Sequence, residues 1–315
     1  MLASAVACAA LPFGIARAAS FLPIAPTDTD PDHVVLLGGL SGNGQVAVGQ
    51  RYCLRNCSDG PFTEAIRWTE AGGFERLGLL PGGTAESGAL GIDDDGSHVV
   101  GFSDAALGLA AFRWRRDTGM VDLDPGPPAG LDSRFSVAID VSADSSVVVG
   151  YRIVERRVSP DGERTDTITQ PFVWTEAGGM RGLEVPDPRG LFNEAHAVSR
   201  DGRFVVGSVE TLRGVEAFVW DEASGLQTLG GPLAAGFIQA DARAVSDDGG
   251  TIVGGGAISI DEGPGARARL LFPGGRHAAS GGLGVALGDE QRERRVGRRI
   301  GRRRKRSTKR ARRRR

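Results

Sequence analysis

Short apolar runs separated by polar turns recur along the chain at a nearly constant spacing. Five stretches share this pattern: GGLSGNGQVAVG (38–49), LGIDDDGSHVVG (90–101), IDVSADSSVVVG (139–150), HAVSRDGRFVVG (196–207) and RAVSDDGGTIVG (243–254). Their closing glycines, which are Gly49, Gly101, Gly150, Gly207 and Gly254, lie 52, 49, 57 and 47 residues apart. Because Asp-Gly pairs between short apolar runs favour tight turns, each stretch predicts a β-hairpin.

A second motif alternates with the first. It reads AIRWTEAGGFERLG (65–78), AFRWRRDTGMVDLD (111–124), PFVWTEAGGMRGLE (171–184) and AFVWDEASGLQTLG (217–230), and it holds all four tryptophans: Trp68, Trp114, Trp174 and Trp220. Each copy predicts two further short strands joined by a polar turn. The repeating unit therefore contains four strands in roughly 50 residues, which is typical of a propeller blade.

The repeat predicts an all-β fold, a β-propeller of four-stranded blades with about five repeats. One four-stranded sheet cannot bury both faces, so neighbouring blades must stack, and we expect side chains such as Phe218 and Val205 to pack between them. The tryptophans are expected to anchor the same core. The fifth unit reaches no A-F-x-W motif, so the last blade is expected to be incomplete, with HVVLLGG (33–39) available to close the sheet and an exposed strand edge remaining.

These alternating A-F-x-W and S-x-D-G-x-x-V-V-G motifs resemble the probable extracellular repeats of the HAF family over roughly residues 34–256. The resemblance implies an exported bacterial β-repeat protein, and it implies no catalytic residues. Two departures are visible in the third unit, which has ADSS where the others keep a glycine and carries an inserted loop, RIVERRVSPDGERTDTITQ (152–170).

The N-terminus has the features of an export signal. An apolar run ends at Ala16-Arg17-Ala18, a small-x-small cleavage pattern, so we assign 1–18 as a signal peptide, 19–32 as a linker and 33–275 as the propeller. The protein is then secreted into the extracellular space or the periplasm of a bacterium. In an oxidising compartment Cys53 and Cys57 are expected to form a disulfide. No other segment is apolar enough to span a membrane.

The C-terminal residues have a different composition from the rest of the chain. Sixteen basic residues and one acid lie from Arg292 onward, whereas 22 basic and 38 acidic residues precede it. We expect 276–315 to be a disordered, low-complexity, Arg-rich tail. It is either a nucleic-acid-binding arm or the product of a frameshift near residues 267–275, and we favour the frameshift.

The sequence offers little catalytic chemistry. It contains no G-x-S-x-G, H-E-x-x-H or Walker A motif, and no cofactor is expected. Asp93 and Asp95 are weak candidates for a Ca²⁺ site, although turn formation explains them more simply. The insertion supplies a candidate binding rim, formed by Arg156, Arg157, Asp161 and Arg164.

These observations favour a monomeric, secreted, non-enzymatic module that binds an extracellular protein or glycan. The alternative is a propeller hydrolase acting on extracellular carbohydrate. An enzyme of that kind would place a cluster of carboxylates in the central channel, on residues that break the repeat.

Overall fold

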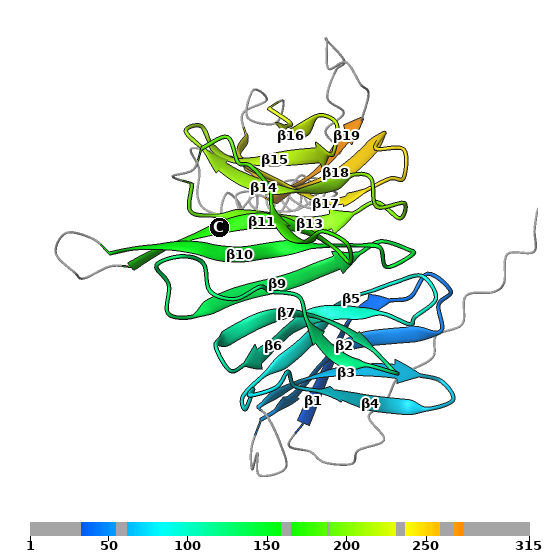
Figure 1. Ribbon diagram of the computed structural model, residues 1–315. Helices are drawn as coiled ribbons and strands as arrows, with labels where there is room; N and C mark the ends of the chain where they lie inside the picture. The colour runs from blue at the N-terminus through cyan, green and yellow to red at the C-terminus, as the bar shows by residue number, and fades with distance from the viewer. Residues whose placement is uncertain are drawn as a thin grey trace, which may run out of the picture.

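The computed structural model describes residues 33–54, 62–158, 165–187, 190–230, 237–258 and 267–273, and within these ranges it contains β-strands and no helix (Figure 1). The strands follow the predicted repeat. The first blade comprises β1 (His33–Leu40), β2 (Val46–Cys53), β3 (Thr63–Thr69) and β4 (Gly73–Gly78). The second comprises β5 (Ser87–Ile92), β6 (Val99–Ala105), β7 (Gly108–Arg115) and β8 (Gly119–Asp122). The third comprises β9 (Arg134–Val141), β10 (Val147–Val158), β11 (Thr165–Thr175) and β12 (Gly179–Gly182).

The fourth blade comprises β13 (Asn193–Val198), β14 (Val205–Thr211), β15 (Gly214–Asp221) and β16 (Gly225–Thr228). The fifth comprises β17 (Phe237–Val245), β18 (Thr251–Ile258) and β19 (Arg267–Pro273). Within each blade the strands pair antiparallel in chain order. The chain is therefore an all-β propeller with four blades of four strands and a fifth blade in which three strands are described.

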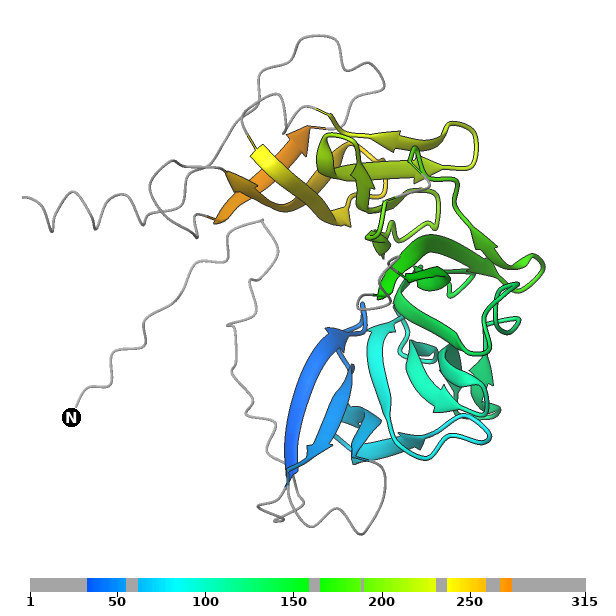
Figure 2. The same ribbon diagram turned by 90° about the vertical axis from the view of Figure 1, so that its left-hand side faces the viewer.

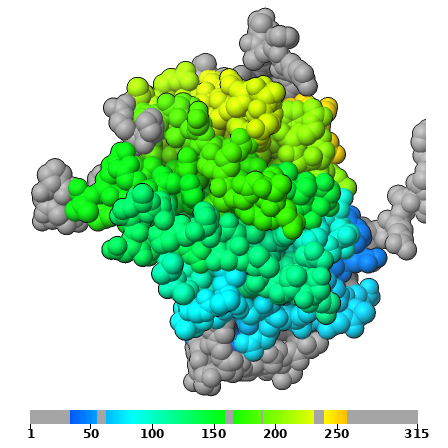
Figure 3. All heavy atoms as spheres, viewed as in Figure 1, coloured from blue at the N-terminus to red at the C-terminus, as the bar shows by residue number. Residues whose placement is uncertain are grey.

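Successive blades stack along an arc, with the first and fifth blades at its two ends (Figure 2). The third strand of one blade starts beside the first strand of the next, as in the parallel pairing of Gly108 with Arg134 and of Val215 with Gln239. In the space-filling view the blades form consecutive layers of the body (Figure 3).

The hydrophobic core lies between the blades, in four separate clusters, one at each boundary. The residue two positions before each tryptophan is at the centre of its blade and is almost fully buried; these residues are Ile66, Phe112, Phe172 and Phe218. The boundary between the third and fourth blades packs Val149 and Val173 against Val205, Phe218 and Trp220. The predicted packing of Phe218 and Val205 between blades is thus confirmed.

Each closing glycine lies opposite a β-bulge in the first strand of its blade. In the fourth blade the bulge at His196 brings the carbonyl of Glu194 to within 2.0 Å of the position that a Cβ on Gly207 would occupy. The corresponding distances at Gly49, Gly101, Gly150 and Gly254 are 2.0, 1.9, 1.9 and 1.8 Å. Since no side chain fits there, the repeated closing glycine is a requirement of the bulged backbone.

Serine and aspartate close the hairpin turn in the same way in most units. The Ser199 hydroxyl donates to Asp201 (2.7 Å) and accepts from the amide of Phe204 (3.0 Å), while Asp201 also accepts from the amide of Arg203 (3.1 Å). The turn is wider than a two-residue hairpin loop, because six residues separate β13 from β14. Gly202 supplies its positive φ of 75°.

The third unit, which lacks the glycine, keeps the same backbone. Ser145 occupies the glycine position with a φ of 60°, and it is the one non-glycine residue with a positive φ in the described ranges. The turn therefore tolerates a left-handed serine at a conformational cost.

The turns are hydrogen-bonded to one another across the blade boundaries. The amide of Asn43 donates to Asp94 O (2.9 Å), that of Asp94 to Ala143 O (3.3 Å), and that of Ala143 to Arg200 O (2.9 Å). The amide of Arg200 donates to Asp247 Oδ1 (2.9 Å). We call this series the turn ladder. It runs in one direction, because each turn donates to the turn of the following blade.

The structure differs from the sequence-based predictions in three places. The insertion in the third unit is not a loop: residues 152–158 and 165–170 extend β10 and β11 as a paired hairpin that projects from the left of the body (Figures 1 and 3). The segment 33–39 forms the first strand of the first blade, where it pairs with β2, and does not close the last sheet. The fifth unit does have a third strand, in which Leu270 pairs with Gly254 and Phe272 with Ile252, the register that Phe218 and Trp220 have in the fourth blade.

Candidate functional site

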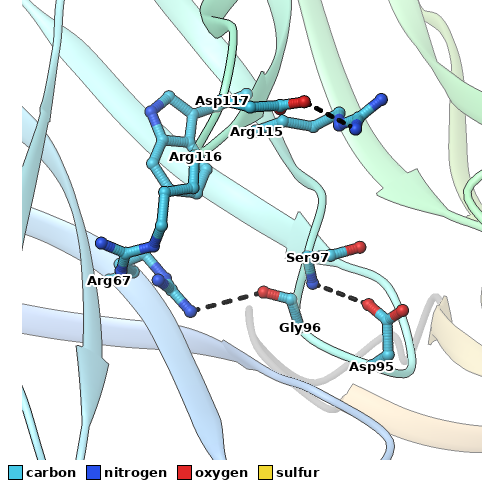
Figure 4. A pocket seen from close by; sticks show the side chains of 8 residues that line it. Arg67, Asp95, Gly96, Ser97, Arg115, Arg116 and Asp117 are labelled. Atoms are coloured by element: carbon cyan, nitrogen blue, oxygen red, sulfur yellow. Dashed lines mark hydrogen bonds and ion pairs between the residues drawn. The ribbon is translucent and has the colours of Figure 1, made fainter.

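A hollow lined by several charged side chains opens at the boundary between the first two blades (Figure 4). Three elements form it: β3, the turn between β5 and β6, and the end of β7 with the turn that follows. Its volume is about 550 Å³, and it is lined by Arg67, Asp95, Gly96, Ser97, Trp114, Arg115, Arg116 and Asp117. A hollow of this size falls within the range of small-molecule sites.

Arg67 forms the buried wall of the hollow. It extends from β3 across the blade boundary, and its guanidinium lies 5.5 Å from the ring centroid of Trp114. It donates to the carboxylate of Glu75 (3.2 Å) and to the carbonyl of Gly96 (3.4 Å). Its Nε is buried without a hydrogen-bond partner among the described residues. This side chain therefore retains an unused donor.

Arg115 and Arg116 form the exposed rim. Arg116 donates to Glu75 (2.6 Å) and Arg115 to Asp117 (2.9 Å). The side chain of Arg116 is 70% exposed and that of Arg115 is 44% exposed. Because exposed ion pairs are weak, both guanidinium groups can exchange these partners for a ligand at little cost.

Arg116 also reverses a charge pattern that the next two boundaries share. Two residues after the tryptophan, the third and fourth blades carry Glu176 and Glu222, which pair with Arg113 (3.2 Å) and Arg181 (3.1 Å) of the preceding blade. The second blade has Arg116 at this position, and the acid, Glu75, comes from the preceding blade. The hollow is thus the place where the boundary chemistry departs from the repeat.

The lining alternates donors and acceptors. Three arginines and two aspartates line the hollow; Arg115 pairs with Asp117, whereas Asp95 accepts from Ser97. Hydrogen bonding by Ser97, whose amide donates to Asp95 (2.8 Å), holds the pKa of that carboxyl below its usual value, so it stays ionised at neutral pH. A simple anion would meet repulsion from the two acids, and a cation would meet repulsion from the three arginines. A hydroxyl-rich molecule, whose groups both donate and accept, suits this lining.

The residues predicted from the repeat take structural positions. Trp114, Trp174 and Trp220 are buried at blade boundaries, and each has an arginine of the preceding blade over its ring, at 5.5 Å (Arg67), 4.7 Å (Arg113) and 5.4 Å (Arg181). Trp68, on the outer face of the first blade, is only partly buried.

The calcium candidates lie in the turn between β5 and β6. Asp93 takes the place of the turn serine and accepts from the amide of His98 (3.1 Å) and the hydroxyl of Ser97 (3.1 Å). Asp95 accepts from the amide of Ser97 (2.8 Å). Both carboxylates thus have turn-forming contacts. In the described part of the chain, no three His, Cys, Asp or Glu side chains gather to hold a metal ion.

The structure describes only some of the residues predicted to form the disulfide and the binding rim. Cys53, at the end of β2, is disulfide-bonded, and its predicted partner Cys57 lies outside the described residues. Arg156 and Arg157 lie on the projecting part of β10, where Arg157 pairs with Glu155 (2.7 Å) and Arg156 with the hydroxyl of Ser133 (3.3 Å). Asp161 and Arg164 lie outside the described residues, as do the signal peptide, the linker and the segment 276–315.

One carboxylate on a first strand breaks the repeat. Asp140 on β9 occupies the position that Gly39, Gly91, Ala197 and Ala244 take in the other blades. It accepts from the amides of Val141 (2.9 Å) and Val198 (3.0 Å), the latter across a blade boundary. Burial raises the pKa of this carboxyl. Its oxygens hold two backbones together, which is a structural role.

The sequence pattern did not identify the hollow. The available signal was the second unit's RWRRD, which differs from the Trp-Thr-Glu or Trp-Asp-Glu of the other three units. This departure does not reveal the hollow by itself, because the partner of Arg116 is Glu75, which lies 41 residues away in the preceding blade.

No protein-family model matches the sequence, and no curated protein matches it. Solved structures do resemble the fold. TolB from Acinetobacter baumannii is 10% identical, with a TM-score of 0.44 over 76% of this chain and 52% of that one. The β-propeller domain of the trilobed protease from Pyrococcus furiosus is 13% identical, with a TM-score of 0.42 over 76% and 69%. An acylaminoacyl peptidase from Pyrococcus horikoshii is 13% identical, with a TM-score of 0.48 over 81% and 40%.

The chain thus spans about half the length of the first of these proteins. Likenesses at this level of identity concern the fold alone, and the protein belongs to the β-propeller class. In the ranges that the structure describes, no helix is long and apolar enough to cross a membrane.

Proposed function

We propose that this chain is an exported, non-enzymatic binding module of the HAF extracellular-repeat type, and that it binds a saccharide in the hollow between the first two blades. The observation that carries the proposal is the mixed lining: one hollow of about 550 Å³ is lined by three arginines and two aspartates, which are Arg67, Arg115, Arg116, Asp95 and Asp117. Sugar hydroxyls can donate hydrogen bonds to the carboxylates and accept them from the guanidinium groups, so each charged lining residue can form a hydrogen bond with the saccharide.

The non-enzymatic part of the proposal is supported by what the repeat-breaking residues do. Asp140 is engaged with two backbone amides, and the acids of the hollow lie beside arginines or within a turn. A hydrolase needs one carboxyl that can donate a proton and a second that can act on the sugar. Asp95, whose pKa is lowered, is unsuited to the first of these roles.

Glycan-array screening of the purified full chain, followed by calorimetry on the saccharides that bind, tests the proposal. We expect Arg115→Ala and Asp117→Ala each to weaken binding about tenfold, since each removes one or two charge-assisted hydrogen bonds. Arg157→Ala is the matched control, because Arg157 is similarly exposed and pairs with an acid two residues away.

The outcomes separate the alternatives. Loss of binding in Arg157→Ala alone would move the site to the projecting hairpin. Cleavage of a bound saccharide, detected by mass spectrometry, would replace the binding module with the hydrolase. Absence of binding to any saccharide at about millimolar concentration would end the proposal. Export is tested separately, by finding whether the mature protein in a bacterial host begins at Ala19.

A further inference from the structure

The two end blades each expose a face that every internal boundary buries. One valine precedes each closing glycine; Val48, Val100, Val149 and Val206 are fully buried against the following blade, whereas Val253 in the fifth blade is 39% exposed. We call this the trailing face of a blade.

The leading face, which packs against the preceding blade, shows the same contrast. Ile92, Val141 and Val198 occupy equivalent positions two residues after the bulge and are at most 9% exposed, and Val245 in the fifth blade is partly buried against the fourth. Leu40, their equivalent in the first blade, is 65% exposed. Among the described residues there are thus one unpaired trailing face and one unpaired leading face, and these two surfaces are the two sides of the same type of interface.

The backbone polar groups at the two exposed faces are also complementary. The turn ladder leaves the carbonyl of Gly42 at one end and the amide of Asp247 at the other, and neither is hydrogen-bonded across a blade boundary within the described ranges. An acceptor therefore ends the ladder at the first blade, and a donor ends it at the fifth. Trp68 also has no arginine over its ring among the described residues, unlike the three other tryptophans.

We propose that the occupant of these faces is a second copy of this chain, docked head to tail, so that the fifth blade of one copy stacks on the first blade of the next. One chain cannot join its own two faces, because they lie at opposite ends of the arc (Figure 2). The contact is heterologous, since different surfaces meet, and it leaves a free face at each end of the assembly. Two copies would place ten blades in series, more than the four to eight of a closed propeller, so growth proceeds as an open row. This assembly replaces the monomer that the sequence predicts.

Sedimentation velocity of the full-length chain from about 1 to about 100 µM tests this assembly. We expect the average mass to rise with concentration. Leu40→Glu places a charge on the leading face and Val253→Glu on the trailing face, and each variant alone should remain monomeric. Leu212→Glu is the control, because Leu212 is 83% exposed in the turn between β14 and β15, away from both faces; it should assemble like the wild type.

Mixing the two variants is the decisive step. The Leu40→Glu chain keeps a working trailing face and the Val253→Glu chain keeps a working leading face, so an equimolar mixture should give dimers and nothing larger. Failure of the mixture to dimerise while the wild type self-associates would indicate another interface. A wild type that stays monomeric throughout, or that assembles only after removal of residues 1–32 or 274–315, would overturn the proposal, since the chain's own segment would then occupy a face.

Discussion

Serine 145 combines an unfavourable backbone conformation with a position that four other units fill with glycine. Its φ of 60° matches the values at Gly44, Gly96, Gly202 and Gly249, which range from 66° to 80°. A left-handed conformation costs a non-glycine residue about 1–2 kcal/mol. Glycine avoids this cost, but its greater freedom in the unfolded state lowers the free energy of unfolding by about 0.4–1 kcal/mol.

Ser145→Gly should therefore raise the free energy of unfolding, by about 1 kcal/mol. Urea denaturation measures the change, and Ser224→Gly serves as the control because Ser224 lies in an exposed turn and has no positive φ. An Ser145→Gly variant less stable than the wild type would show that the serine contributes something besides its backbone shape.

The turn aspartates make stability depend on pH. The hydroxyl of Ser199, which donates to Asp201, holds the pKa of that carboxyl below its usual value, and Ser146 and Ser246 act similarly on Asp144 and Asp248. A carboxyl with a lowered pKa in the folded state stabilises the protein at neutral pH, and this contribution is lost as the pH falls through about 4 and below. Asp140, with a raised pKa, acts in the opposite direction but is a single group.

Asp201→Asn should make the acid-induced loss of stability shallower between about pH 5 and pH 3, because one titrating group is removed. The first blade supplies the precedent: Asn43 accepts from the Ser41 hydroxyl (2.8 Å) and the amide of Gln45 (2.9 Å) in the equivalent turn. Urea midpoints across this range measure the effect. Asp201→Ala, which loses the hydrogen bonds as well, should be less stable than the wild type at every pH. If the stability of Asp201→Asn falls with pH as steeply as that of the wild type, Asp201 does not contribute to the acid sensitivity.

Between elements, an arginine over a tryptophan recurs at three boundaries although its origin in the sequence changes. Arg67 and Arg113 each precede the tryptophan of their own blade, on the third strand. In the third blade that position is Val173, and the arginine comes from its cross-strand partner Arg181 on β12. Pairing between β11 and β12 thus places a guanidinium group over the tryptophan of the next blade, although the third strand has a valine at the usual arginine position.

Arg113→Met should lower the free energy of unfolding by about 1–2 kcal/mol, because a largely buried cation over an aromatic ring is lost while the aliphatic stem is kept. Arg115→Met, two positions along the same strand and not over a ring, should change stability by less than about 0.5 kcal/mol. Equal effects of the two substitutions in urea denaturation would mean that the ring contact contributes nothing.

Across the whole molecule, the repeat predicted the strands and their stacking, because a period of about 50 residues with one tryptophan per unit leaves few alternatives to a propeller. It could not predict contacts that depend on the register between neighbouring blades. The pairing of Arg116 with Glu75 is of this kind, and so is the position of Arg181 over the ring of Trp220. The polar residues of the projecting part of β10, such as Glu155 and Arg156, predict a loop, whereas the structure pairs them with the largely polar start of β11.

The bulge with its opposed glycine has a further consequence for how such chains change length. Since every first strand bends at the same place and every closing glycine leaves room for that bend, a blade meets its neighbours through the same surfaces wherever it stands in the series. A blade could then be duplicated or deleted as a unit without redesign of its neighbours, much as in other repeat proteins. Gain or loss of one such unit would alter the extent of the arc while leaving each remaining boundary as it was.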